Sequence, residues 1–341
     1  MMPQAVAAFL FLGVIAYCLF GGADFGAGFW DLTAGGAERG RRPRHLIDTS
    51  LSPVWEANHT WLIYCLVFLW TGFPSAFTAI TTTLYIPLGI AVLGIVLRGA
   101  GFAFRKASLR TPEQRLYGVA FAASSVLTPY CFGSIAGGIA SGRVPTAGNG
   151  DPVTSWLNPT SVLGGVLAVL VCAYLAAAYL YVAARQQRDH TLQRYFRGRA
   201  LLAAALTGVV SIAGVFVLRQ DSPHLFRRLS HGALPLVLLA ALCGVATMVM
   251  MWRERTRFLR GLAAAAVALV VLGWGVAQYP YLLGTHVEIG AAAAPEATLA
   301  VTIGVAVVAG LLIFPSLALL FRLANRGALR PPEQEVSEHG R

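Results

Sequence analysis

The chain has 341 residues, of which 57% are hydrophobic and only 12% are charged, and its formal net charge is +11. Soluble domains carry about 25% charged residues, so this composition excludes an ordinary soluble protein and predicts that lipid covers much of the surface. The positive charge does not indicate nucleic-acid binding, because the arginines fall in short clusters between apolar stretches, as in membrane-protein loops.

Long apolar stretches recur along the whole chain. A helix needs about 20 mostly apolar residues to cross a bilayer, and backbone groups in lipid must be hydrogen-bonded internally, so each stretch predicts a transmembrane helix. Nine are expected, at residues 4–31, 53–72, 75–97, 116–140, 160–184, 199–218, 232–252, 261–283 and 297–321. The predicted fold class is therefore an all-α polytopic membrane protein.

The basic residues predict the orientation. Of the 26 Lys and Arg residues, 22 lie after the first, third, fifth and seventh spans or in the C-terminal tail. The positive-inside rule assigns these segments to the cytoplasm, so the N-terminus is expected outside and the C-terminus in the cytoplasm. The four exceptions are Arg143, Arg219, Arg227 and Arg228, and the last two fit this orientation least.

The first three spans carry polar residues on their cytoplasmic side. Asp24 lies in the inner third of the first span, whereas Asp31 at its end is expected to be solvated. Glu56 and His59 share one face of the second span, and Arg98 ends the third. Charge inside a membrane is costly and marks function. Two interpretations stay open: a buried relay for cytoplasmic protons, or ion pairs that lock three helices together.

Glycines and possible metal ligands add little to the prediction. Gly22 and Gly26 are four residues apart, a spacing that allows close helix packing. Glu56 and His59 match Glu-x-x-His, but a di-iron site needs two such motifs and two further glutamates, so no metal is expected. The five cysteines are isolated in apolar stretches, which favours neither zinc nor covalently attached haem.

Three segments resemble subunit II of the cytochrome bd-type quinol oxidase family. They are Gly-Gly-Ala-Asp-Phe-Gly-Ala-Gly at 21–28, Ser-Pro-Val-Trp-Glu-Ala-Asn-His-Thr-Trp-Leu-Ile at 52–63, and Leu-Arg-Gly-Ala-Gly-Phe-Ala-Phe-Arg at 97–105. The resemblance covers most of the chain in order and is strongest over 20–105.

The resemblance implies a function within a respiratory complex of the bacterial plasma membrane. Such a complex oxidises a membrane quinol and reduces dioxygen to water, and a larger partner, subunit I, carries two b-type haems and haem d. Subunit II generally binds no haem, supports subunit I and helps to deliver cytoplasmic protons. Some members hold a structural quinone. Expected partners are subunit I, quinol, dioxygen and lipid, with room for small accessory subunits.

The family resemblance also implies a division of the chain. Residues 1–140 are expected to form a first four-helix bundle that carries the polar motifs, and 141–283 a second. Residues 284–329 hold a peripheral ninth helix, and 330–341 a disordered cytoplasmic tail rich in charge and proline.

Two acidic residues match positions that the family uses. Asp24 and Glu56 are the expected proton pathway, and Ala103 stands where some members have an acid, so the route is expected to be short. The supporting polar cluster comprises Trp55, Asn58, His59, Trp61, Arg98 and Arg105. Two alternatives stay open. One is a proton-coupled secondary transporter, because such transporters contain broken helices and Gly21-Gly22 could form such a break. The other is a structural membrane scaffold.

Overall fold

In the computed structural model, the backbone is described for residues 1–50, 55–107 and 111–325. Side chains are described over the same ranges except at 37, 55–58, 102–107, 111–117, 314, 317–318 and 320–325. The helices are α1 (Met2–Leu32), α2 (Ala37–Ser50), α3 (Trp55–Gly72), α4 (Pro74–Thr83), α5 (Tyr85–Ala107), α6 (Thr111–Ala140), α7 (Pro159–Gln186), α8 (His190–Asp221), α9 (Pro223–His231), α10 (Leu234–Trp252), α11 (Leu259–Gln278), α12 (Ile289–Ala292) and α13 (Glu296–Asn325), and the strands are β1 (Tyr281–Leu283) and β2 (Val287–Glu288).

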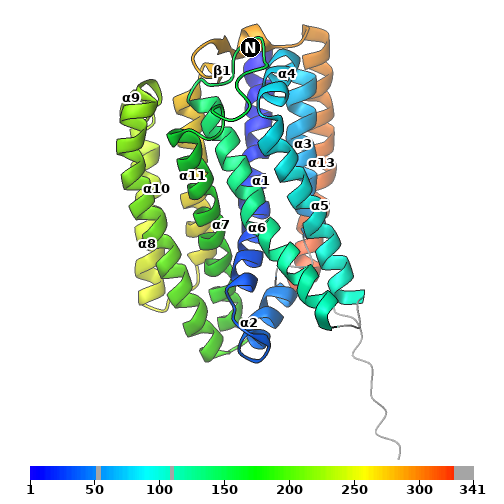
Figure 1. Cartoon of the computed structure of the whole chain (residues 1–341), viewed down its shortest axis with the longest axis vertical. Coiled ribbons are helices and arrows are strands. Elements are labelled where there is room, and N and C mark those ends of the chain that lie inside the picture. Colours follow the sequence, from blue (N-terminus) through cyan, green and yellow to red (C-terminus); the bar gives the residue numbers. More distant parts are fainter. Residues whose placement is uncertain (51–54, 108–110, 326–341) are drawn as a thin grey trace, which may run out of the picture.

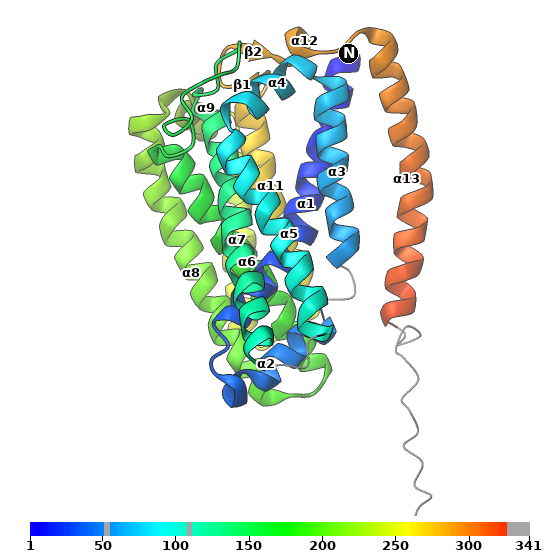
Figure 2. The same cartoon turned by 45° about the vertical axis from the view of Figure 1, so that its right-hand side comes forward.

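The long helices run side by side along one axis (Figure 1). The N-terminus, the β1–β2 hairpin, α4, α9 and α12 lie at one end of the bundle, and α2 lies at the other end. Helix α1 contacts α3, α6 and α7 and so occupies the centre. Helix α13 stands at the edge, where it contacts α1 and α3 (Figure 2).

The described helices confirm a polytopic, all-α membrane protein. Seven of them are long and apolar enough to cross a bilayer, namely α1, α6, α7, α8, α10, α11 and α13. The pair α3 and α4 passes the same test only together, with a bend of 118° between them, which would make eight. The apolar part of α5, Tyr85–Gly101, is shorter.

Several sequence-based boundaries differ from the structure. The expected span over 75–97 is divided, because α4 ends at Thr83 and α5 begins at Tyr85. The span expected to end at 283 stops at Gln278, since Pro280 cannot continue a helix and 281–283 is strand β1. The loop expected after the first span contains helix α2. The tail 330–341 lies outside the described residues.

Apolar side chains form two large buried cores, a small third one around Leu225 and Ala233, and a wide lipid-facing surface. One core joins the second half of α1 to α7, α8 and α11, and the other joins the first half of α1 to α3, α4, α12 and α13. Outward-facing residues are strongly exposed, as at Ile212 (67%), Leu242 (63%) and Leu311 (71%). A soluble protein would bury such side chains, whereas lipid solvates them.

Local signals fix where α7 and α8 begin. The Asn158 side chain accepts a hydrogen bond from the Ser161 amide at 2.9 Å, and Pro159 occupies the first turn of α7. The Asp189 carboxylate accepts from the amides of Thr191 and Leu192, both at 3.0 Å, and so caps α8. These caps satisfy donors that a helix start otherwise leaves unpaired.

Candidate functional site: a buried ion pair between the first and fifth helices

Two deeply buried charged residues of the described spans are paired with each other. Nη2 of Arg98 in α5 donates to Oδ1 of Asp24 in α1 at 2.7 Å, and Nε donates to Oδ2 at 3.1 Å. Nη2 also donates to the backbone carbonyl of Asp24 at 2.7 Å. Asp24 is 6% exposed and Arg98 2%. A forked guanidinium–carboxylate pair is among the strongest polar contacts that a protein forms.

Helix α6 completes the surroundings of Arg98. The third guanidinium nitrogen, Nη1, donates to the Ser125 hydroxyl, which itself donates to the Phe121 carbonyl at 2.7 Å. The guanidinium carbon lies 4.3 Å from the centre of the Phe121 ring and 5.1 Å from that of Phe25. Arg98 is therefore held by charge, hydrogen bonds and two aromatic faces from α1 and α6.

The second polar helix, α3, approaches this pair through His59. The imidazole lies close enough to interact electrostatically with both Asp24 and Arg98. Trp61 stacks on Phe20 of α1, with ring centres 6.3 Å apart and an interplanar angle of 16°. The side chains of four further expected site residues, Trp55, Glu56, Asn58 and Arg105, lie outside the described residues. The structure thus brings together Asp24, His59 and Arg98.

The glycines of α1 set how closely α7 approaches. A Cβ atom at Gly26 would lie 1.9 Å from the Cys172 carbonyl oxygen and 2.8 Å from the Ala176 Cβ, so only glycine fits. At Gly22 a Cβ would lie 3.5 Å from Leu175, which is ordinary contact. The close helix crossing therefore depends on Gly26, less than one turn beyond Asp24.

Two residues beside the ion pair, Ser125 and Tyr17, were not predicted from the sequence. The ring of Tyr17 lies along Gly21, where an added Cβ would be 2.9 Å from its Cε2, and meets Phe25 edge-on at 6.4 Å. Its buried hydroxyl has no hydrogen-bond partner among the described residues. Ser124-Ser125 was the available signal for Ser125, because adjacent serines are unusual in an apolar span.

Asp31 is not solvated as expected. It is 6% exposed, and its Oδ1 accepts a hydrogen bond from Nε of Arg44 in α2 at 2.6 Å. Nη2 of Arg44 also donates to the Gly35 carbonyl at 2.6 Å. Helix α2 folds back over the end of α1, which removes this carboxylate from water.

At the opposite end of the bundle, two of the basic residues that depart from the positive-inside rule have partners of their own. Both terminal nitrogens of Arg143 bind the Asp221 carboxylate, at 2.7 and 3.0 Å. Arg228 donates to the Tyr279 carbonyl and lies 5.4 Å from the centre of the Tyr281 ring. Local contacts explain two of the four exceptions.

No metal-binding cluster is evident in the described part of the chain, where no three His, Cys, Asp or Glu side chains gather. The five cysteines are free thiols. The polar groups described around Asp24 are therefore an ion pair, hydroxyls and an imidazole. Such groups can hold charge and exchange protons.

The matching family model is the one described as cytochrome bd terminal oxidase subunit II, over residues 2–324. Among curated relatives, the cytochrome bd ubiquinol oxidase subunit 2 of Bacillus subtilis (strain 168) is 24% identical over 266 residues, covering 77% of this chain and 75% of the relative. A putative cytochrome bd menaquinol oxidase subunit II of the same organism is 21% identical and covers 92% of each chain.

A solved structure agrees in fold. The bd oxidase of Geobacillus thermodenitrificans contains a chain that superposes with a TM-score of 0.75 at 25% identity, covering 94% of this chain and 98% of that one. Because the family model spans nearly the whole sequence, the chain belongs to the cytochrome bd terminal oxidase subunit II family and is a multi-pass subunit of an oxidoreductase complex.

Proposed function

We propose that this chain is the haem-free accessory subunit of a quinol oxidase in the bacterial plasma membrane. The larger subunit I would carry two b-type haems and haem d, oxidise quinol and reduce dioxygen to water. The names of the relatives support this proposal, since both Bacillus proteins are called quinol oxidase subunits. We also propose that the complex has room for a structural quinone and for small accessory subunits.

The proposed membrane arrangement has nine transmembrane helices with the N-terminus outside. Counting the bent pair α3 and α4 as one span and adding α5 to the seven long helices supports this number. The pairing of Arg143 with Asp221 supports the orientation, because it neutralises one of the exceptional cations on the outer side. Two bundles at 1–140 and 141–283, with 284–329 peripheral, complete the proposal.

The chain is further proposed to help deliver cytoplasmic protons through Asp24 and Glu56. The observation that carries this proposal is the buried Asp24–Arg98 pair with His59 beside it, in the half of α1 nearer α2. An ion pair excluded from water is expensive to bury and contributes less stability than an apolar substitute would. Its presence therefore favours a role beyond packing.

Arg98 limits what Asp24 can do. A neutral Asp24 would leave the buried Arg98 guanidinium without its counter-charge, which is costly. Glu56, three residues before His59, is then the proposed entry residue, and Asp24 with Arg98 stabilises charge beyond it. The helix-locking interpretation predicts instead that Asp24 acts only on assembly.

Turnover of the purified two-subunit complex separates these interpretations. Glu56→Gln should slow quinol-driven oxygen uptake by roughly tenfold or more, as expected for loss of a positioned proton carrier, while the haem d absorbance per protein stays unchanged. Asp24→Asn should also slow turnover. The matched control is Asp31→Asn, since Asp31 is the other buried, arginine-paired carboxylate of α1. Normal turnover in the Glu56 variant would exclude it from the proton path.

A further inference from the structure

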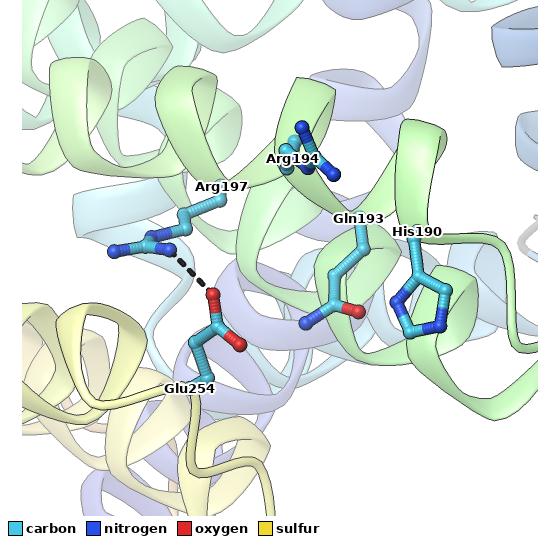
Figure 3. Close-up of a pocket in the computed structure, with 5 residues that line it drawn as sticks. All are labelled: His190, Gln193, Arg194, Arg197 and Glu254. Carbon is cyan, nitrogen blue, oxygen red and sulfur yellow. Dashed lines mark hydrogen bonds and ion pairs between the residues drawn. The ribbon is translucent and has the colours of Figure 1, made fainter.

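A small polar pocket lies at the α2 end of the bundle, where the turn between α10 and α11 meets the start of α8. Its volume is about 130 Å³, and it is lined by His190, Gln193, Arg194, Arg197 and Glu254 (Figure 3). The first four residues follow the three- and four-residue spacing of one helix face, so a single face of α8 supplies them. Only Glu254 comes from the other segment.

Gln193 offers the pocket an amide that none of the described residues engages. The residue is 7% exposed and lines the pocket, and its side chain makes no hydrogen bond to the described residues. The amide atoms are not themselves fully buried, so they face the pocket space and are free to bind a group there.

The acidic groups near the pocket are already engaged. Oε1 of Glu254 accepts from Nη1 of Arg197 at 2.8 Å, and Asp189 caps α8 while pairing with Arg42 at 2.7 Å. Arg194 is exposed and forms no ion pair with the described residues. Because Asp189 already occupies the first amides of α8, the donors left for a ligand are Arg194 and the Gln193 amide, and they favour an anion.

The position of the pocket is that of lipid headgroups. Trp252, whose carbonyl accepts from Arg197 at 3.2 Å, is 72% exposed, as tryptophans at membrane interfaces are. Exposed apolar residues of α8 begin at Leu202 (56%) and Leu206 (44%), further along the same helix. The volume is below the roughly 300–1,000 Å³ of drug-sized ligand pockets and admits only one small group.

We propose that this pocket binds the phosphate of an anionic phospholipid, whose acyl chains lie against α8 and α10. Arg194 would contact the phosphate oxygens, Arg197 would contribute from its Glu254-bound position, and the Gln193 amide would donate to the same group. Basic pockets between helices on the cytoplasmic side suit anionic headgroups. The inference rests on the proposed orientation but not on proton delivery.

Lipid binding to the intact, delipidated oxidase complex tests this site. Native mass spectrometry should show dioleoylphosphatidylglycerol binding at least tenfold more tightly than dioleoylphosphatidylcholine. Arg194→Gln should weaken phosphatidylglycerol binding about tenfold, the loss expected for one charge-assisted hydrogen bond in a partly hydrated site. Arg255→Gln removes an equal charge from the α10–α11 turn outside the pocket and should leave binding unchanged.

A second variant and two further outcomes make the test decisive. Gln193→Leu keeps every arginine and should weaken binding as well, while oxygen uptake and the haem spectrum report separately on folding and proton delivery. Equal binding of both lipids, or unchanged binding in both pocket variants, would refute the proposal. Full displacement of phosphatidylglycerol by millimolar inorganic phosphate would overturn the lipid assignment and give the pocket to a soluble anion instead.

Discussion

The guanidinium of Arg98 in α5 donates hydrogen bonds to both the carboxylate and the backbone carbonyl of Asp24 in α1, although 74 residues separate the two in the chain. One guanidinium therefore binds both the side chain and the backbone of Asp24. It joins α1 to α5 at the point where Ser125 of α6 also binds the guanidinium. Three helices are therefore fixed in register by one arginine.

A double-mutant cycle on this pair should separate its structural and functional roles. Arg98→Gln alone leaves the Asp24 carboxylate buried without its counter-charge and should destabilise the complex by about 3–5 kcal/mol. Combining it with Asp24→Asn should recover much of that loss, because neither charge is then left alone. Thermal loss of the haem d band measures the effect.

Turnover of the double variant adds the functional half of the cycle. If its stability recovers while oxygen uptake stays slow, Asp24 acts in proton transfer. If both recover, the pair is only a lock between helices.

The two glycines of α1 should respond differently to the same substitution. Gly26→Ala forces a Cβ into the Cys172 carbonyl and should cost about 1–3 kcal/mol or prevent assembly, as overpacking does. Gly22→Ala meets only ordinary contacts and should be neutral or slightly stabilising, since alanine favours helix. Yield and thermal midpoint of the complex measure both, and equal effects would contradict a helix crossing that depends on Gly26.

At the end of the bundle opposite α2, Arg143 should matter more than Arg219. Arg143→Gln removes two bonds to Asp221, which also accepts from the Thr160 hydroxyl at 2.6 Å, and should cost about 1–3 kcal/mol. Arg219 is exposed, so Arg219→Gln should change stability by less than about 0.5 kcal/mol. Thermal unfolding of the complex measures both, and a comparable loss in the two variants would show that net charge, not the ion pair, is responsible.

The cap of α8 predicts a pH dependence. Hydrogen bonds from the Leu192 amide first, and the nearby Arg42, hold the pKa of Asp189 below its ordinary value. A depressed carboxyl pKa contributes stability that is complete at neutral pH and is lost as the pH falls through the folded-state pKa, below about 4. Asp189→Ala should therefore cost about 1 kcal/mol at pH 7 and progressively less in acid.

Asparagine at the same position is the matched control. Asp189→Asn keeps a capping oxygen and loses only the exposed pair with Arg42, so it should stay within about 0.5 kcal/mol of the native chain at pH 7. Unfolding of the complex followed at pH 7 and pH 3 distinguishes the two variants, and identical losses would show that charge rather than capping stabilises α8.

The amino-acid sequence by itself determined the membrane class, the approximate spans and the family. Lipid leaves the backbone no alternative to internal hydrogen bonds, so long apolar stretches become helices whatever surrounds them. The motifs around Asp24 and Glu56 identified the family for a similar reason: each is contiguous in the chain. The boundary at Leu84, between α4 and α5, was misplaced.

Only the tertiary structure decided which polar groups meet. Arg98 and Ser125 could face lipid, partner or one another, because helix formation does not fix the rotation of each helix about its axis. Packing fixes that rotation, through contacts such as Gly26 against Cys172. The same holds for Gln193, whose burial beside Arg194 and Glu254 follows from where the α10–α11 turn lies, a long-range outcome that no local pattern encodes.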